Sequence, residues 1–312
     1  MLTITLIGTA ATMPLPDRAL TTAFAECRGH GILFDCGEGT QAAARRAGVN
    51  LMKADVICLT HYHGDHIFGL PGLLQTLACQ GRTRPLYIFG PEGLHEVFSA
   101  IHTLAGPLPY QIKTGIADKE PICLDKTIDG WPSGAALYPI STHHRVPSRG
   151  YKLVLPRAGR FMPEKARELG VPVNLWKSLQ KGDTVEFAGC TVMSEQVLGE
   201  PRKSLSFVFS GDTAVCPALE DAVKDVDLFI CDATYSEPEQ AEQAKQYGHS
   251  TFGQMAALAS RAGAKRLWLA HYSPMITEPE SALPQARLFY PEAECGFDGK
   301  RITLQYGEDA PQ

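Results

Sequence analysis

The chain has 312 residues, 44% of them hydrophobic, and a formal net charge of −5. This length and composition suffice for one large or two small α/β domains and exclude a disordered chain. The negative charge argues against a protein that coats nucleic acid indiscriminately, and no apolar run approaches the length of a membrane-spanning helix. We therefore expect a globular protein with no membrane partner.

The cysteines and the N-terminus indicate the compartment. Nine cysteines are odd in number, form no CxxC pair and are scattered through apolar runs. This usage is typical of reduced, buried thiols in the cytosol. The first residues, MLTITLIGTA, have no Lys or Arg before Arg18, and so predict a first strand in place of a signal peptide. The sequence therefore predicts a cytoplasmic protein.

Short β-branched or apolar runs alternate with helical patterns along the chain. In the first half, strands are expected at residues 3–8, 31–36, 55–60 and 85–90, and helices at 41–48 and 73–80. In the second half, strands are expected at 135–141, 150–156, 191–196, 205–213, 227–234 and 265–273. Thr251 and Gln254 form a capping-box pattern that begins a helix over 252–263. Two strand-rich halves closed by helices predict two sheets between helical layers.

Residues 151–181 differ from the rest of the chain in charge. Seven Lys or Arg residues stand against two acidic ones, and turns at Pro156, Gly159 and Gly170 surround a short helix over 162–169. Tyr151, Phe161 and Trp176 interleave with the basic residues. Two interpretations remain open on the residues alone: a surface that binds phosphates by releasing counterions, or a solvated surface insertion.

The motif His61-Tyr62-His63-Gly64-Asp65-His66 places four possible metal ligands within six residues, directly after a buried strand. Imidazole and carboxylate are the ligands that zinc and similar divalent metals prefer, and Gly64 allows a tight turn between them. Four ligands from one turn can divide between two neighbouring ions. The cluster therefore predicts a metal site.

Further candidate ligands follow other expected strands. These are His143 and His144, Asp212, and His271. Residues just past the carboxyl ends of several strands meet at one edge of an α/β fold, where sites are common. Taken singly, each is more often a structural residue or a turn former. The His61–His66 cluster alone supplies too few ligands for two ions. Its presence therefore favours the interpretation of these further residues as metal ligands.

The motif HxHxDH is the signature of the metallo-β-lactamase superfamily, and the chain resembles its ribonuclease Z branch, the tRNA 3′-processing endonucleases. The segments TLIGTAATMP, FDCGEGTQ, LTHYHGDHIFGLPGLL, FSGDT, GHST and LAHYS follow the pattern of that branch in order from residue 3 to about 273. His144 also has the branch's spacing to Tyr151. The resemblance implies a four-layer αββα sandwich, one domain over residues 1–312, with a basic arm inserted at 151–185.

The resemblance also implies how the site works. His61, His63 and His144 would hold one zinc ion, Asp65, His66 and His271 the other, with Asp212 bridging; manganese suits the same ligands. Two such ions, about 4 Å apart, activate a shared water for attack on a phosphodiester. Asp65 would act as general base, and His249, oriented by Asp232, would protonate the leaving 3′ oxygen. His143 and Cys231 are left without an assigned role.

The resemblance implies a tRNA precursor as substrate and a homodimer in which the arm of one subunit serves the other's site. The RNA-binding candidates are Arg157, Arg160, Lys165, Arg167, Lys177 and Lys181. Three departures affect RNA recognition. The arm lacks the Pro-Gly-Pro run, the loop at 14–19 keeps only Pro14 and Arg18 of its pattern, and Ser273-Pro274-Met275-Ile276 replaces Ser-x-Arg-Tyr. A hydrolase of the same fold acting on small phosphodiesters, or on another small molecule, is therefore the alternative.

Overall fold

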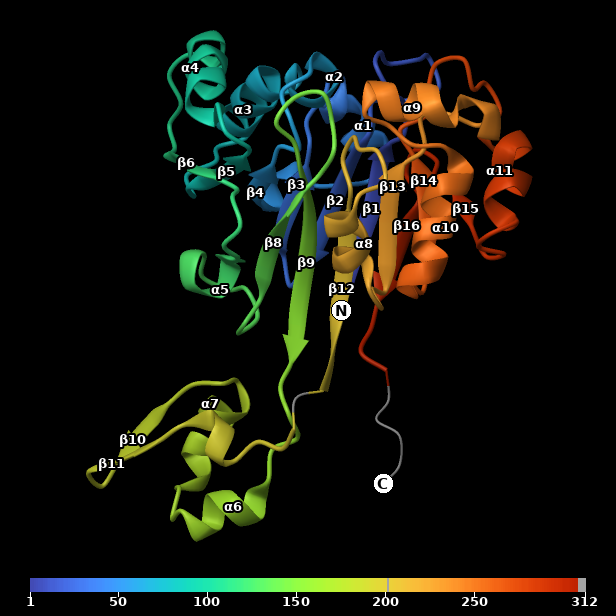
Figure 1. Cartoon of the computed structure of the whole chain (residues 1–312). Helices are drawn as coiled ribbons and strands as arrows, with labels where there is room; N and C mark the ends of the chain where they lie inside the picture. The colour runs from blue at the N-terminus through green and yellow to red at the C-terminus, as the bar shows by residue number, and fades with distance from the viewer. Residues whose placement is uncertain (201, 308–312) are drawn as a thin grey trace.

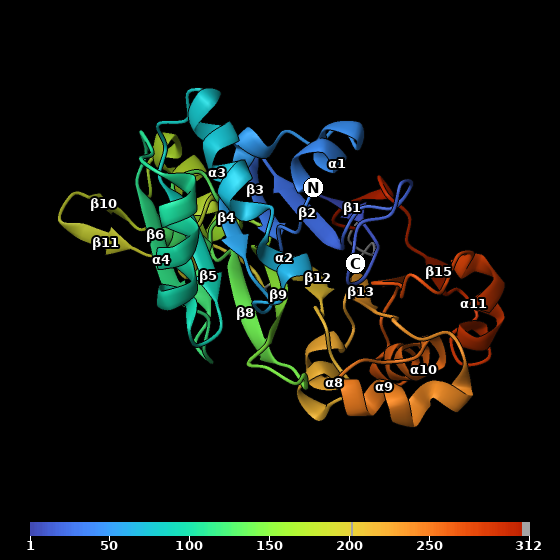
Figure 2. The ribbon, with the colours of Figure 1, turned by 90° about the horizontal axis from the view of Figure 1, so that it is seen from above.

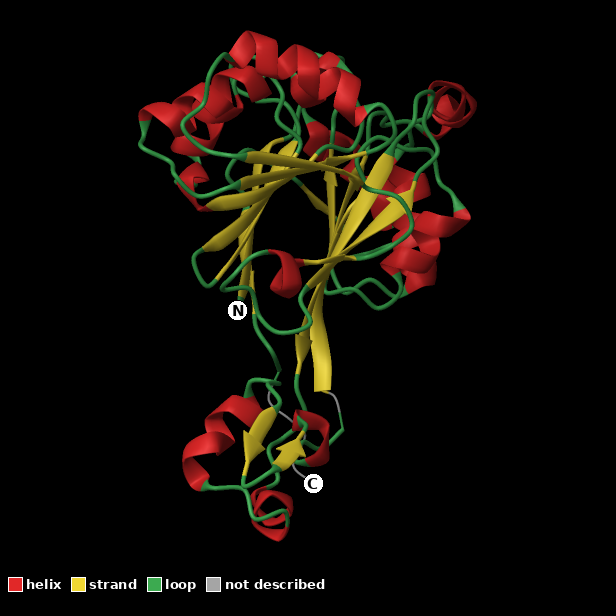
Figure 3. Cartoon of the chain, turned by 90° about the vertical axis from the view of Figure 1, so that its left-hand side faces the viewer, coloured by secondary structure: helices red, strands yellow, loops and turns green. Residues whose placement is uncertain are grey.

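The computed structural model describes residues 1–200 and 202–307. Two seven-stranded sheets face each other, and helices cover the outer face of each (Figures 2 and 3). The first sheet has the order β16 (Arg301–Leu304), β1 (Leu2–Gly8), β2 (Thr22–Cys27), β3 (His30–Phe34), β4 (Ala54–Cys58), β5 (Leu86–Gly90) and β6 (Ile112–Ile116). The predicted four-layer αββα fold is confirmed.

The second sheet has the order β15 (Glu294–Cys295), β14 (Leu267–Ala270), β13 (Leu228–Asp232), β12 (Arg202–Phe209), β9 (Arg149–Arg157), β8 (Ala136–Ser141) and β7 (Ile122–Cys123). Strands β12 to β15 are parallel, while β9 runs antiparallel to both β12 and β8. Strands β8, β12, β13 and β14 therefore all end at the same edge. That edge carries the candidate ligands.

The core between the sheets is a continuous apolar cluster from both inner faces. The Phe34 ring of β3 packs edge-on against Phe207 of β12, with 5.4 Å between ring centroids. The first outer layer consists of α1 (Thr40–Arg46), α3 (Leu70–Cys79) and α4 (Leu94–Ala105), and the second of α8 (Pro217–Val223), α10 (Phe252–Ala262) and α11 (Pro279–Arg287). Further helices are α2 (Gly64–Ile67), α5 (Leu124–Thr127) and α9 (Ala241–Tyr247). Among the described residues, no helix is both long and apolar enough to cross a bilayer.

The strands predicted between residues 3 and 90 correspond to β1, β3, β4 and β5, and the capping-box helix corresponds to α10. The side chain of Thr251 accepts a hydrogen bond from the Gln254 amide, as the pattern requires. The strand predicted at 191–196 was wrong in its second half. Strand β11 ends at Val192, because the Gln196 side chain accepts a hydrogen bond from the Met193 amide (2.8 Å) and closes a 3₁₀ turn.

A small arm projects from the sandwich below β9 and β12 (Figures 1 and 3). It contains α6 (Pro163–Glu168), α7 (Trp176–Gln180), β10 (Val185–Phe187) and β11 (Cys190–Val192). Six buried apolar side chains form its own core, which is separate from the clusters of the sandwich. At its base the Gly199 amide donates to the Arg160 carbonyl (2.8 Å).

The predicted boundaries of the arm, 151–185, differ from the structure. Residues 151–157 pair with β8 and β12 inside the sheet, so the projecting segment covers about 158–200. This segment carries five Lys or Arg residues and six Asp or Glu residues. The folded arm is therefore not basic overall: its positive charge lies towards α6 and α7, and the hairpin of β10 and β11 adds acidic residues that the sequence interpretation left out.

Candidate metal centre

The HxHxDH motif follows β4 and folds into the single turn of α2. The His66 amide donates to the His63 carbonyl (3.0 Å), which turns the motif back on itself. A Cβ on Gly64 would lie 2.3 Å from the Phe68 ring, so a larger residue here would displace that exposed side chain. The turn directs all four predicted ligands of the motif to one place.

The first ligand group comprises His61, His63 and His144. Nε2 of His61 lies 2.9 Å from Nδ1 of His63, and Nε2 of His144 lies 3.3 Å from the same atom. Burial is the largest cause that lowers the pKa of each of the three. Neutral imidazoles with converging nitrogens are what a divalent metal requires.

The second ligand group comprises Asp65, His66 and His271. Oδ2 of Asp65 lies 3.5 Å from Nε2 of His66 and 3.7 Å from Nε2 of His271. Asp65 also accepts a hydrogen bond from the Thr12 amide (2.8 Å). One carboxylate and two imidazoles therefore face a common point.

Asp212 lies between the two groups. Its Oδ2 is 3.7 Å from Nε2 of His61 and 3.4 Å from Nε2 of His66, and its Oδ1 is 3.1 Å from Nε2 of His271. Burial alone would raise the pKa of Asp212, but the neighbouring histidines, His271 first, hold it well below the usual range. An ionised carboxylate that touches both groups is placed to bridge two ions.

Three polar atoms of the centre are buried and find no hydrogen-bond partner among the described residues. They are Nε2 of His66, Oδ1 of Asp212 and Nε2 of His271. A buried polar atom without a partner costs about 1–3 kcal/mol, so several in one place call for an ion or an ordered water. The donor set, the geometry and these atoms all fit a pair of divalent metal ions.

Groups behind the ligands fix their orientation. In His61, Nδ1 contacts Thr60 Oγ1 (3.0 Å), and in His66 it contacts Asp35 Oδ2 (2.7 Å). In His271, Nδ1 contacts Thr234 Oγ1 (2.9 Å), and in His144 it contacts the Gly248 carbonyl (2.8 Å). Each contact leaves Nε2 free to face the centre. Sequence reasoning assigned no role to Asp35, Thr60 or Thr234, although the Asp at the end of the apolar run ILFD is a signal that could have found the first.

Thr234 provides a test of this outer layer. Its hydroxyl donates to Asp232 Oδ1 (2.7 Å) and so can only accept from Nδ1 of His271, which fixes the tautomer of that ring. We expect Thr234→Val to weaken metal affinity by about 10- to 100-fold, and Thr234→Ser to restore it. Competition with a chromophoric chelator measures this directly. Equal affinity of the Val variant and the unmodified protein would show that Thr234 does not orient His271.

His249 and Asp232 form a pair beside the ligands. Nδ1 of His249 lies 2.7 Å from Oδ2 of Asp232. Burial would lower the pKa of His249, but Asp232 raises it to about 9. His249 lies 4.0 Å from Oδ2 of Asp212 and 5.0 Å, between ring centroids, from His144. The pair therefore borders the centre.

A further possible ligand group joins Asp232 and His249 to Asp212 and His271. Both oxygens of Asp232 are already used: Oδ2 accepts from the Thr213 amide and His249, and Oδ1 from the amide and hydroxyl of Thr234. Its position suits the support of a neighbouring histidine better than the binding of an ion.

The two residues left unassigned by the sequence lie outside the ligand groups found among the described residues. His143 is exposed, and its amide donates to Thr213 Oγ1 (3.0 Å). Cys231 is buried in the apolar cluster below α10, and burial raises the pKa of its thiol well above the usual value. Its thiol is therefore a packing group.

The RNA-binding candidates fall into two places. Arg160, Lys165, Arg167, Lys177 and Lys181 are exposed on the arm. Arg157 belongs to β9, where its guanidinium lies over the Tyr306 ring and donates to the Gly307 carbonyl (2.8 Å). Five of the six thus lie exposed on one projecting segment, and Arg157 supports its base.

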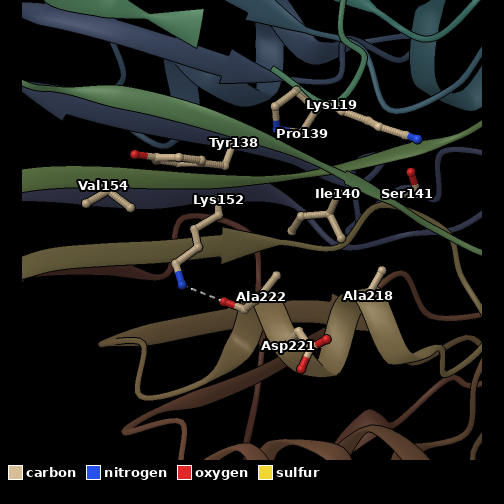
Figure 4. Close-up of a pocket in the computed structure, with 10 residues that line it drawn as sticks. All are labelled: Lys119, Tyr138, Pro139, Ile140, Ser141, Lys152, Val154, Ala218, Asp221 and Ala222. Atoms are coloured by element: carbon tan, nitrogen blue, oxygen red, sulfur yellow. Dashed lines mark hydrogen bonds between the residues drawn. The ribbon is translucent and has the colours of Figure 1, made fainter. Parts of the chain in front are cut away.

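A groove of about 550 Å³ lies away from the metal centre, on the outer face of β8 and β9 beside α8 (Figure 4). Lys152 crosses it and donates to the Ala222 carbonyl (2.8 Å). Its lining contains one carboxylate, Asp221, and no histidine. The groove therefore lacks the ligands for metal chemistry.

Comparison with known proteins supports the assignment of these residues to a metal centre. Residues 24–215 match the metallo-beta-lactamase superfamily. The chain is 41% identical to a ribonuclease Z of Agathobacter rectalis and 39% identical to one of Lachnoclostridium phytofermentans, covering 99% of this chain and 100% of each relative. The crystal structure of the short form of human tRNase Z shares the fold, with a TM-score of 0.67 and 24% identity over 97% of this chain and 99% of that one.

Proposed function

Because the chain belongs to the ribonuclease Z family of the metallo-β-lactamase superfamily, we propose that it is a two-zinc endoribonuclease that removes 3′ trailers from tRNA precursors. The observation that carries the proposal is the position of Asp212, whose two oxygens face both ligand groups. Two ions bound there would lower the pKa of a shared water towards neutrality and clamp the attacking and leaving oxygens.

The residues of the chain supply the proton transfers. Burial tends to raise the pKa of Asp65, but His271 and His66 hold it below the usual range, so the carboxylate is ionised and can accept a proton from the attacking water. His249 donates Nδ1–H to Asp232, and its other nitrogen, Nε2, carries the proton for the leaving 3′ oxygen. With a pKa of about 9, His249 is protonated at neutral pH.

The position of the arm supports a homodimer. Strand β9 starts at Arg149, whose amide donates to the Thr60 carbonyl next to His61, and ends at Arg157 at the base of the arm. Nine residues at about 3.3 Å each make a strand of roughly 30 Å. The arm thus projects away from the centre of its own subunit (Figure 1). A second copy whose site receives this arm would make use of its exposed basic residues.

Two finer assignments rest on chemistry. Zinc suits the mixed imidazole and carboxylate ligands, and manganese is the alternative for the same groups. Nine free cysteines and membership of this family support a cytoplasmic location.

Cleavage of a 3′-extended tRNA precursor, measured beside hydrolysis of a p-nitrophenyl diester, tests the function. We expect zinc-loaded protein to cut the precursor just after the discriminator base, and Asp65→Ala to lose both activities. The arm has no net positive charge and Met275 stands where the family places arginine, which favours the small-diester alternative. Diester turnover with an uncut precursor would establish that alternative.

A variant in which a short glycine linker replaces residues 160–199 tests, in the same assay, whether the arm is needed for tRNA cleavage and not for hydrolysis itself. The Gly199 amide already bonds the Arg160 carbonyl, so the ends of the deletion meet without strain. We expect this variant to retain diester hydrolysis and lose precursor cleavage. Unchanged cleavage of the precursor would remove the arm from substrate binding.

A further inference from the structure

An arginine and a tyrosine form a stacked pair at the rim of the metal centre. Arg145 follows the ligand His144, and Tyr247 precedes Gly248 and His249. The Arg145 guanidinium carbon lies 5.1 Å from the centre of the Tyr247 ring. Both side chains are exposed. The pair therefore spans the loop that carries a metal ligand and the loop that carries the candidate acid.

The two loops are held firmly together. The ring of His144 bonds the Gly248 carbonyl (2.8 Å), and Gly248 has a φ of +73°. A Cβ on Gly248 would lie 2.8 Å from His144 Cα and 3.1 Å from the Arg145 amide. This close approach fixes the backbone that carries both members of the pair. The guanidinium is thus presented from a rigid position, although its side chain is long.

The charge of Arg145 is not neutralised by an ion pair among the described residues, whereas Arg149 is bound to Asp118 and to two carbonyls. Burial is the largest cause that lowers the pKa of His63, and the positive charge of Arg145 adds a smaller lowering. Arg145 is therefore within electrostatic range of the first ligand group.

The loop that follows His271, residues 272–278, contains no Lys or Arg. Met275 is 88% exposed in the loop after His271, and Arg18, which lies nearby, donates to the Ile276 and Thr277 carbonyls (2.9 and 3.1 Å). A phosphodiester chain that enters the centre would therefore find the exposed guanidinium of Arg145 next to the ligand His144.

We infer that Arg145, braced on Tyr247, binds the phosphate of the nucleotide whose 3′ oxygen leaves. This inference rests on the proposed function, because His249 must reach that oxygen. Tyr247 stands two residues before His249, and His144, the neighbour of Arg145, has its ring 5.0 Å from that of His249. Guanidinium forms charge-assisted, often bidentate bonds to phosphate, and stacking on an aromatic ring limits the entropy lost on binding. The tRNA product of this cleavage ends at the discriminator nucleotide, so it keeps the contact after cleavage.

Binding of a labelled tRNA that ends at the discriminator nucleotide to the zinc-loaded protein, measured over a series of KCl concentrations, tests the inference. We expect Arg145→Ala to weaken binding about 10- to 100-fold at low salt and to reduce the slope of log affinity against log salt by about 0.7–0.9, the value for one phosphate contact. Tyr247→Leu is expected to weaken binding and leave that slope unchanged. Arg266→Ala, exposed at the opposite end of β14 from His271, is the charge-matched control.

The possible outcomes are distinct. An Arg145→Ala variant with the affinity and salt slope of Arg266→Ala would overturn the inference while precursor cleavage by the unmodified protein still stands. Loss of bound zinc in Arg145→Ala would also overturn it, because Arg145 would then support the metal centre. If the unmodified protein hydrolyses the diester and leaves the precursor uncut, the proposed function fails and the inference fails with it.

Discussion

Replacement of Asp212 by alanine is expected to abolish hydrolysis of both the tRNA precursor and the small diester. The carboxylate faces His61 and His66 with one oxygen and His271 with the other, so its loss leaves each ion one ligand short. A metal pair contributes several kcal/mol of transition-state stabilisation, so a fall in kcat of about a thousandfold or more is expected. Elemental analysis should show the loss of one or both ions.

The fold should persist in this variant, because the removed charge lies among histidines and not in the apolar core. Circular dichroism checks this point. Asp227→Ala is the matched control: Asp227 is equally buried at the start of β13, accepts from the Ser206 amide (2.9 Å) and pairs with Lys265, far from the ligands. It should lose stability and keep its metals. Full metal content and full rate in Asp212→Ala would refute the bridging assignment.

Replacement of His249 by alanine is expected to separate the two substrates. Metal content should stay intact, since His249 is not assigned to either ion. Cleavage of the precursor, whose leaving alkoxide needs a proton, should fall by about 10²- to 10⁴-fold. Hydrolysis of a p-nitrophenyl diester should fall far less, because that leaving group departs as a stable anion. Rate measurements on both substrates decide the point, with His143→Ala as the control. Equal losses on both would reject the acid role.

The same residue predicts a pH dependence. Asp232 raises the pKa of His249 from 6.5 to about 9, so the acid form is present below pH 9 and is lost as the pH rises through that value. Precursor cleavage should therefore decline above about pH 9. Asp232→Asn should move that decline towards lower pH, because the raising charge is gone. An unchanged pH profile in this variant would show that Asp232 does not raise the pKa of His249.

The sequence by itself determined the local features of this protein. Four ligands within the six residues His61–His66 need only one turn to converge. The strands β1, β3, β4 and β5 were predictable because each is a short apolar run between turns. The αββα architecture followed from the motifs, and it is confirmed.

Tertiary structure decided which distant residues meet. The expected strand ends placed Asp212 and His271 at one edge, but only the parallel arrangement of β12, β13 and β14 brings Oδ1 of Asp212 to 3.1 Å from Nε2 of His271. Thr234 and Asp35 gain their roles in the same way, through hydrogen bonds to rings supplied by other segments. The limits of the arm could not be predicted from the sequence either, because residues 151–157 join the sheet only through their pairing with β8 and β12. Contacts between remote segments carry no periodic signal in the chain, and the packing of the two sheets fixes them.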